Sequence, residues 1–188
     1  MNVKDAIFAR RSIRKFTQEK PDKDALLTLV DCARVAAYGA NMQPLKFRLI
    51  TEDNEVDAIF PTIKWAGYLK DGAPKDGEQP RAYIALFGDL SVRSNGAFET
   101  DAGAAVTNMM LEAVELGLAT CWLGAIDRNK IAEILNVPEN LKVLYLLAVG
   151  YGAQDSKIIE MQDGDVKYFV DETGTVNVPK RSLEDVLV

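Results

Sequence analysis

The amino-acid sequence predicts one domain of the α+β class that spans residues 1–188. Three observations favour this class. A chain of 188 residues is long enough for one domain to bury about 70% of the surface of its unfolded state. Stretches with helical periodicity are interspersed with short apolar or alternating runs that are typical of strands. The sequence has no internal repeat and no low-complexity segment, so we expect a single folded unit.

Two helices and a strand are expected in the first fifty residues. Residues 2–10 carry apolar side chains at helical spacing behind Asn2, which is a good capping residue. A second helix with a broad apolar face is expected over residues 21–39. The next residues, 38–44, have the composition of a loop, and 45–51 alternate apolar and cationic side chains as a strand does.

The segment 61–80 lies between a short helix expected at 54–60 and a buried strand expected at 81–88. It is rich in Gly, Pro, Lys and Asp, yet it contains Trp65 and Tyr68. A long, weakly structured segment inside a compact domain is more often a lid or binding loop than a connector. The two aromatic side chains could cover a flat ligand, or they could simply anchor the segment to the core.

Residues 101–118 predict the longest helix of the chain. Its polar residues Asp101, Asn108, Glu112 and Glu115 fall within a stripe about 60° wide, and nearly all of the rest is apolar. A chain this short has few other helices to cover such a surface. We therefore expect a partner subunit, with a central helix of a monomer as the alternative.

The last third of the chain predicts more strands than helices. A strand-like run at 117–127 leads into a helix at 128–136, and 142–150 form a continuous apolar strand. A hairpin is expected around 172–175.

Composition excludes several classes of function. Twenty-two cationic residues against 28 acidic ones give a net charge of −6, which argues against a general nucleic-acid or anionic-membrane surface. No run is long and apolar enough for a membrane span or a signal peptide, so we expect a cytoplasmic protein. The two cysteines, Cys32 and Cys121, fit core positions in a reduced protein and give no metal pattern.

The sequence contains no histidine. This absence removes Ser-His and Cys-His nucleophile pairs, histidine zinc sites and imidazole acid–base chemistry. Any reaction must therefore depend on carboxylates, lysine, tyrosine or a bound cofactor.

A basic cluster follows the first helix, at residues 10–16. Arginine forks and a serine hydroxyl are groups that hold a phosphate monoester by charge-assisted hydrogen bonds. The alternative is that these cations only complement the negative end of the helix dipole. Two later amides, Asn41 and Gln43, could read the edge of a planar heterocycle or could satisfy the backbone of their own turn.

Five stretches, taken in order, resemble the nitroreductase family of FMN-dependent oxidoreductases over nearly the whole chain. They are residues 10–16, 41–44, 120–127, 147–152 and 180–185. The resemblance implies an α+β fold with a central mixed or antiparallel sheet flanked by helices. It also implies an intertwined homodimer with two FMN sites at the subunit interface.

The resemblance implies two groups of flavin contacts. Residues matching family positions around the FMN phosphate and ribityl chain are Arg10, Arg11, Ser12, Arg14 and, from the tail, Lys180 or Arg181. Residues matching positions beside the isoalloxazine ring are Asn41, Gln43, Gly124 and Ala125, the last two in a turn whose N–H groups face flavin N5 and O4. The chain departs from the common family pattern at Tyr38, Leu45 and Ala125, where Ser, Trp and Gly are frequent.

The implied reaction passes a hydride from NADH or NADPH through flavin N5 to a nitroaromatic, quinone or similar small acceptor. It requires no catalytic side chain, because the cofactor carries the chemistry. Substrate choice is expected to lie in segment 61–80. Two alternatives use the same residues: a non-enzymatic binding or storage protein for FMN or another phosphorylated ligand, and a structural dimer without a ligand.

Overall fold

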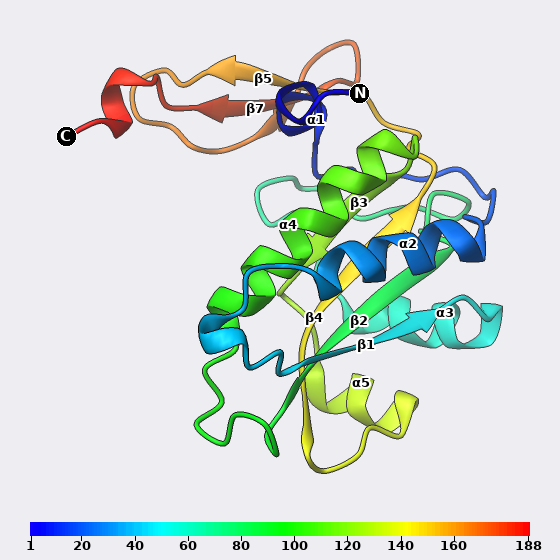
Figure 1. Cartoon of the computed structure of the whole chain (residues 1–188). Coiled ribbons are helices and arrows are strands. Elements are labelled where there is room, and N and C mark those ends of the chain that lie inside the picture. Colours follow the sequence, from blue (N-terminus) through cyan, green and yellow to red (C-terminus); the bar gives the residue numbers. More distant parts are fainter.

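A four-stranded antiparallel sheet forms the centre of the structure, a computed structural model that describes residues 1–188 (Figure 1). Its strands lie in the order β1-β2-β4-β3. Their bounds are β1 Leu45–Ile50, β2 Ala82–Asp89, β4 Leu141–Gly150 and β3 Ala119–Leu123. Each coincides with a predicted strand, and the α+β class is confirmed. Every residue of β2 is buried, whereas β1 and β3 form the two edges.

Helices cover both faces of this sheet. The helices α2 (Lys23–Arg34) and α4 (Glu99–Glu115) pack together on one face, and α3 (Asp53–Ile59) and α5 (Arg128–Leu135) cover the other. Side chains alternate along a strand, so each strand contributes to both cores. In β2, Ile84 and Leu86 belong to the core under α2 and α4, whereas Ala85 and Phe87 belong to the opposite core.

The first helix, α1 (Val3–Ala9), lies against the C-terminal end of α4. Asn2 caps it as predicted by accepting a hydrogen bond from the Asp5 N–H at 2.9 Å, and the terminal ammonium pairs with Glu115 at 2.7 Å. The chain then runs parallel to the start of β3, where the Ile13 N–H donates to the Thr120 carbonyl at 2.9 Å. The basic cluster is thereby fixed beside an edge strand.

The second helix is shorter than predicted, because it ends at Arg34 and not near Gly39. The Tyr38 hydroxyl donates to the Ala33 carbonyl at 2.9 Å, so a side chain from beyond the helix satisfies one of its last carbonyls. A short 3₁₀ turn, η1 (Gly39–Asn41), then leads to β1. A second 3₁₀ turn, η2 (Phe60–Thr62), directly follows α3.

The polar stripe of the longest helix, α4, is covered in its first half, whereas Glu115 at its end is exposed. Asp101 is only 2% exposed, and the Asn108 side chain donates to the Cys32 carbonyl of α2 at 3.1 Å. The half-covered face carries small and apolar residues instead, namely Gly103, Ala104, Thr107, Leu111 and Val114. Of the two cysteines, Cys121 is buried as expected, whereas Cys32 is only partly buried.

A C-terminal arm extends beyond the main sheet (Figure 1). Its small sheet has the order β5-β7-β6, with β5 (Ser156–Glu160) parallel to β7 (Val176–Lys180) and β6 (Phe169–Val170) antiparallel to it. The predicted hairpin around 172–175 is the β6–β7 turn, whereas β5 was not predicted. A last 3₁₀ turn, η3 (Glu184–Val186), follows. None of the helices combines the length and apolar character that crossing a membrane requires.

Candidate functional site

Three of the four cations in the basic cluster have no acidic partner, whereas Lys15 pairs with Glu78 at 2.9 Å. None of the nine ion pairs of the structure involves Arg10, Arg11 or Arg14. Two of these guanidinium groups donate to nearby carbonyls instead, Arg11 to the Arg10 carbonyl at 2.6 Å and Arg14 to the Ser12 carbonyl at 3.3 Å. The Ser12 hydroxyl makes no hydrogen bond within the protein.

Arg11 is the most constrained member of the cluster. Its Nε is buried and has no hydrogen-bond partner. Burial lowers the pKa of Arg11, and the neighbouring Arg10 charge lowers it further. Burial also raises the pKa of the Cys121 thiol, while the charges of Arg14 and Arg10 act in the opposite direction. The cluster lies beside the start of β3, where Ser12 pairs with Thr120, and an anion bound there would offset its positive charge.

The turn after β3 offers free backbone donors. The N–H groups of Gly124, Ala125 and Ile126 donate to no atom of the protein, whereas the carbonyls of Gly124 and Ala125 both accept hydrogen bonds. The Ala125 carbonyl accepts from the Lys64 N–H at 2.8 Å, and the Gly124 carbonyl accepts from the Arg128 guanidinium at 3.1 Å. The turn is thus held in place through its carbonyls and leaves its N–H groups for a ligand.

This turn borders a cavity of about 680 Å³. The cavity lies between two stretches, residues 58–64 and 124–130, which are joined by the antiparallel pairing of Ile63 with Ile126. Its charged lining consists of Lys64, Asp127, Arg128 and Lys130. Three cations against one carboxylate make the cavity positive in an acidic protein.

The strand β3 connects the basic cluster with the turn. Ser12 pairs with Thr120 near the start of the strand, and Gly124 follows its end. Four residues of extended chain separate these two points, which corresponds to about 13 Å. Between them Trp122 is 38% exposed, and its ring meets the Tyr145 ring edge-on at 5.2 Å. A ligand with an anionic end and a flat ring can therefore lie along this edge.

The loop that carries Asn41 and Gln43 lies at the opposite edge of the sheet, because it precedes β1. Three strand spacings, about 14 Å, separate β1 from β3. The Gln43 amide donates to the carbonyl and side-chain oxygens of Asn41 at 3.2 Å. Ala40, Asn41 and Gln43 all have positive φ, near 50°. The structure of one chain does not bring this loop to the cavity.

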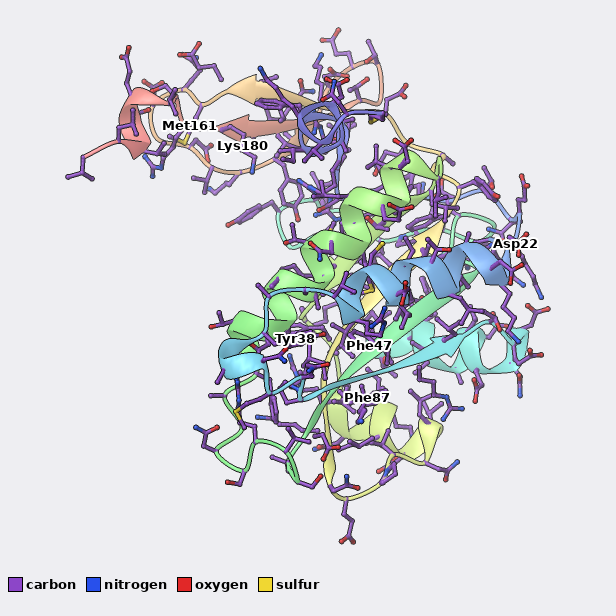
Figure 2. The ribbon with its side chains drawn as sticks, viewed as in Figure 1. Asp22, Tyr38, Phe47, Phe87, Met161 and Lys180 are labelled. Carbon is purple, nitrogen blue, oxygen red and sulfur yellow. The ribbon has the colours of Figure 1, made fainter.

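Lys180 and Arg181 are likewise distant from the turn within one chain. Lys180 ends β7, and Figure 2 shows it on the arm beside Met161, away from the main sheet. The Met161 N–H donates to the Lys180 carbonyl at 2.9 Å, so this part of the arm is ordered by its own hydrogen bonds. Neither cation takes part in an ion pair.

The two aromatic residues of segment 61–80 differ in their environment. Trp65 is partly buried and packs on Phe60 with ring centroids 5.9 Å apart. This position fits the alternative that its side chain anchors the segment to the core. Its indole N–H is buried without a partner. Tyr68 is 55% exposed, and its ring meets Tyr168 of the arm edge-on at 5.1 Å. Only Tyr68 therefore lies free at the surface.

Sequence reasoning missed three side chains at this site. Lys64 and Arg128 line the cavity only because the chain pairs residue 63 with residue 126, and no sequence motif marks that pairing. The third is Tyr168, over whose ring the Arg14 guanidinium lies at 4.5 Å from the centroid. Each depends on contacts between segments that are far apart in the sequence.

Comparisons with known proteins identify the family and the fold of the chain. A model described as "Nitroreductase family" matches residues 7–151. A protein of Archaeoglobus fulgidus, provisionally named NADH dehydrogenase/NAD(P)H nitroreductase, is 24% identical over 84% of this chain and 89% of its own length. The NADPH-flavin oxidoreductase of Vibrio harveyi is 26% identical over 84% of this chain and 68% of its own length.

The same likeness extends to solved structures. A protein of Desulfovibrio desulfuricans, provisionally described as a nitroreductase and crystallised in complex with FMN, is 28% identical and has a TM-score of 0.71. The match covers 100% of this chain and 96% of that chain.

Proposed function

The chain belongs to the nitroreductase family, and from that premise we propose that it is an FMN-dependent oxidoreductase. It takes two electrons from NADH or NADPH and passes them to a small organic acceptor such as a quinone or nitroaromatic compound. With a quinone the balance is NAD(P)H, one proton and quinone giving NAD(P)⁺ and hydroquinone. The observation that carries the proposal is that uncompensated cations and free backbone donors lie at the two ends of one edge strand.

The basic cluster fits the phosphate end of FMN. Arg10, Arg11 and Arg14 have no carboxylate partner, and the Ser12 hydroxyl is free to donate. Guanidinium forks and a hydroxyl form charge-assisted hydrogen bonds with phosphate oxygens. The Nε of Arg11 is the strongest sign of fit, since a buried N–H group without an acceptor is costly.

The turn at Gly124 and Ala125 fits the ring end. FMN supplies the redox chemistry when bound, because its ring accepts two electrons and releases them to the acceptor. The free N–H groups of the turn would donate to acceptor atoms at the ring edge. Lys64 and Arg128 line the cavity beside this turn and would add positive charge near the ring. The absence of histidine is then no obstacle, because no side chain needs to transfer a proton.

The proposal includes a homodimer. Asn41 and Gln43 lie at the β1 edge and Lys180 and Arg181 on the arm, so these residues reach a flavin at β3 only if a second chain supplies them. The half-covered face of α4, with its small residues, gives such a chain a surface on which to pack.

The test uses the purified full-length protein. We expect a flavin absorbance spectrum, either as isolated or after FMN is added, and loss of the oxidised-flavin band on anaerobic addition of NADH or NADPH. Re-oxidation by 1,4-benzoquinone should then restore the band. A protein that takes up no FMN would contradict the proposal.

The storage alternative gives a different result in the same experiment. A storage protein binds FMN but keeps the oxidised spectrum in the presence of either nicotinamide. Gel filtration of the FMN-loaded protein completes the test, since a monomeric species that still reduces acceptors would contradict the dimeric site.

A further inference from the structure

Two cations that line the cavity beside Gly124, Lys64 and Arg128, form no ion pair within the protein. Their free charge indicates which kind of acceptor the cavity binds. We propose that the cavity selects acceptors that carry a carboxylate, or a similar small anionic group, close to their reducible group. Lys64 and Arg128 are the residues that recognise this group. The inference rests on the proposed function, which it extends to a class of substrate.

Lys64 is held at the cavity by its backbone. Its N–H donates to the Ala125 carbonyl at 2.8 Å, which places its Cα directly beside the turn. Its side chain is exposed, lines the cavity and belongs to no ion pair. An ammonium group in this position is available for a ligand anion.

Arg128 provides the second cation. Its Nη2 donates to the Gly124 carbonyl at 3.1 Å, and its guanidinium carbon lies 6.0 Å from the centroid of the Tyr145 ring. These contacts fix the guanidinium next to the turn but use only one of its five N–H donors in a hydrogen bond. No carboxylate lies within ion-pair distance of it.

The remaining charged groups of the cavity already have partners. Lys130 pairs with Glu133 at 2.9 Å. The Asp127 carboxylate accepts from the Lys130 N–H at 3.0 Å and so caps the N-terminus of α5. That helix end contributes further positive potential to the cavity. Lys64 and Arg128 are therefore the two cations left to bind a ligand.

The negative group that binds these cations could be a phosphate of NADH or NADPH or a carboxylate of the acceptor, and the position of the cations distinguishes between the two. Arg128 contacts the carbonyl of the turn itself, so an anion bound to it lies within one side-chain length of the turn. The phosphates of NADH or NADPH are separated from the nicotinamide ring by a ribose, whereas the carboxylate of a benzoate-like acceptor is attached directly to the ring. The geometry therefore favours a small aromatic carboxylate.

A matched pair of acceptors tests the inference on the FMN-loaded dimer. We expect a higher kcat/KM for 4-nitrobenzoate than for the neutral 4-nitrobenzamide, and a lower KM should account for the difference. In Lys64→Met and Arg128→Met the ratio of the two values should fall by about tenfold or more. Lys142→Met, which changes an exposed lysine of β4 outside the cavity, is the matched control and should keep the wild-type ratio.

Direct binding separates this inference from the proposed function. Benzoate cannot be reduced, so its binding in a calorimetric titration does not depend on turnover. Tighter binding of benzoate than of benzamide, lost in Lys64→Met, would support the anion site even if no nicotinamide reduced the flavin.

Three results would overturn the inference. The first is equal binding of benzoate and benzamide to the wild-type protein. The second is a fall in the rate of flavin reduction by NADPH in the variants while the acceptor ratio stays constant, which would assign the cations to the donor. The third is a lowered flavin midpoint potential with an unchanged acceptor ratio, which would assign them to the flavin.

Discussion

The guanidinium carbon of Arg14 lies 4.5 Å from the centroid of the Tyr168 ring, and the same ring meets Tyr68 edge-on at 5.1 Å. Through Tyr168 the arm thus contacts both the basic cluster and segment 61–80. The backbone supports this junction, because the Arg14 N–H donates to the Gln154 side chain at 3.3 Å and the Ala153 N–H to the Lys15 carbonyl at 2.9 Å. A ligand that moves the Arg14 guanidinium away from the Tyr168 ring would remove one of the contacts that hold the arm.

The first prediction concerns Tyr168. Replacing it with Leu removes the aromatic face that orients Arg14, a contact of about 0.5–1 kcal/mol at a partly exposed site. FMN affinity should then fall about two- to fivefold in a fluorescence titration. Tyr168→Phe keeps the ring and should bind FMN as the wild type does. Equal losses in both variants would show that the hydroxyl, and not the ring, is responsible.

The second prediction concerns the basic cluster itself. Arg10→Ala and Arg14→Ala should each weaken FMN binding by roughly 1.5–3 kcal/mol, because each removes a charged contact with the phosphate. The matched control is Arg34→Ala, which removes an exposed arginine whose partner is Asp31. Riboflavin, which lacks the phosphate, provides the second control, since its affinity should not change in either variant. An unchanged FMN affinity would place the phosphate elsewhere.

Local patterns in the sequence were sufficient to predict most elements of the fold. The helix behind Asn2 and the four central strands follow from capping and periodicity, and they occur within a few residues of their predicted bounds. The second helix ends early in a tight turn, in which the Ala36 N–H and the Tyr38 hydroxyl both donate to the Ala33 carbonyl. The strand β5 escaped detection because it depends on parallel pairing with β7, about twenty residues later.

The candidate site was predictable in its motifs and not in its assembly. The cationic run and the Gly124 turn could be singled out from the sequence, and the structure places them at the two ends of β3. Lys64 and Arg128 meet only through the pairing of Ile63 with Ile126, which is a tertiary contact. The periodicity of a sequence also gives no information on which residues a second chain would add to the site.

The third prediction concerns the loop before β1. Asp101 accepts from the Gly39 N–H at 2.9 Å and pairs with Arg93 at 3.0 Å, and Arg93 also donates to the Ala97 carbonyl at 2.6 Å. Asp101→Asn removes the charge but keeps an oxygen for the Gly39 N–H. The unfolding free energy should fall by roughly 1.5–3 kcal/mol in urea denaturation.

The same substitution should loosen the loop itself. Its residues Ala40, Asn41 and Gln43 have positive φ, which is unfavourable for side chains other than glycine and persists only while the surroundings enforce it. Limited proteolysis should therefore cut within 38–44 faster in Asp101→Asn than in the wild type. The control Asp31→Asn removes one partner of an exposed ion pair and should leave the cleavage rate unchanged. Equal rates in all three proteins would contradict a holding role for Asp101.

The last prediction concerns Tyr83, whose hydroxyl is buried in β2 without a hydrogen-bond partner. Burial raises the pKa of Tyr83, and the charges of Asp57 and Cys121 raise it further, so the folded protein keeps the phenol neutral. Tyr83→Phe removes an unsatisfied polar atom and should increase the unfolding free energy at pH 7 by about 1–2 kcal/mol. Chemical denaturation at pH 7 measures this difference.

Tyr83 should also make the unfolding free energy of the wild type depend on pH differently from that of Tyr83→Phe. The unfolded chain releases the tyrosine proton at a pKa of about 10, whereas the folded protein retains it. Stability linked to Tyr83 is therefore complete below pH 10 and is lost as the pH rises further. Above pH 10 the wild type should lose about 1.4 kcal/mol per pH unit more than Tyr83→Phe, in which this titration is absent. Parallel pH profiles of the two proteins would show that the hydroxyl reaches solvent or finds a partner.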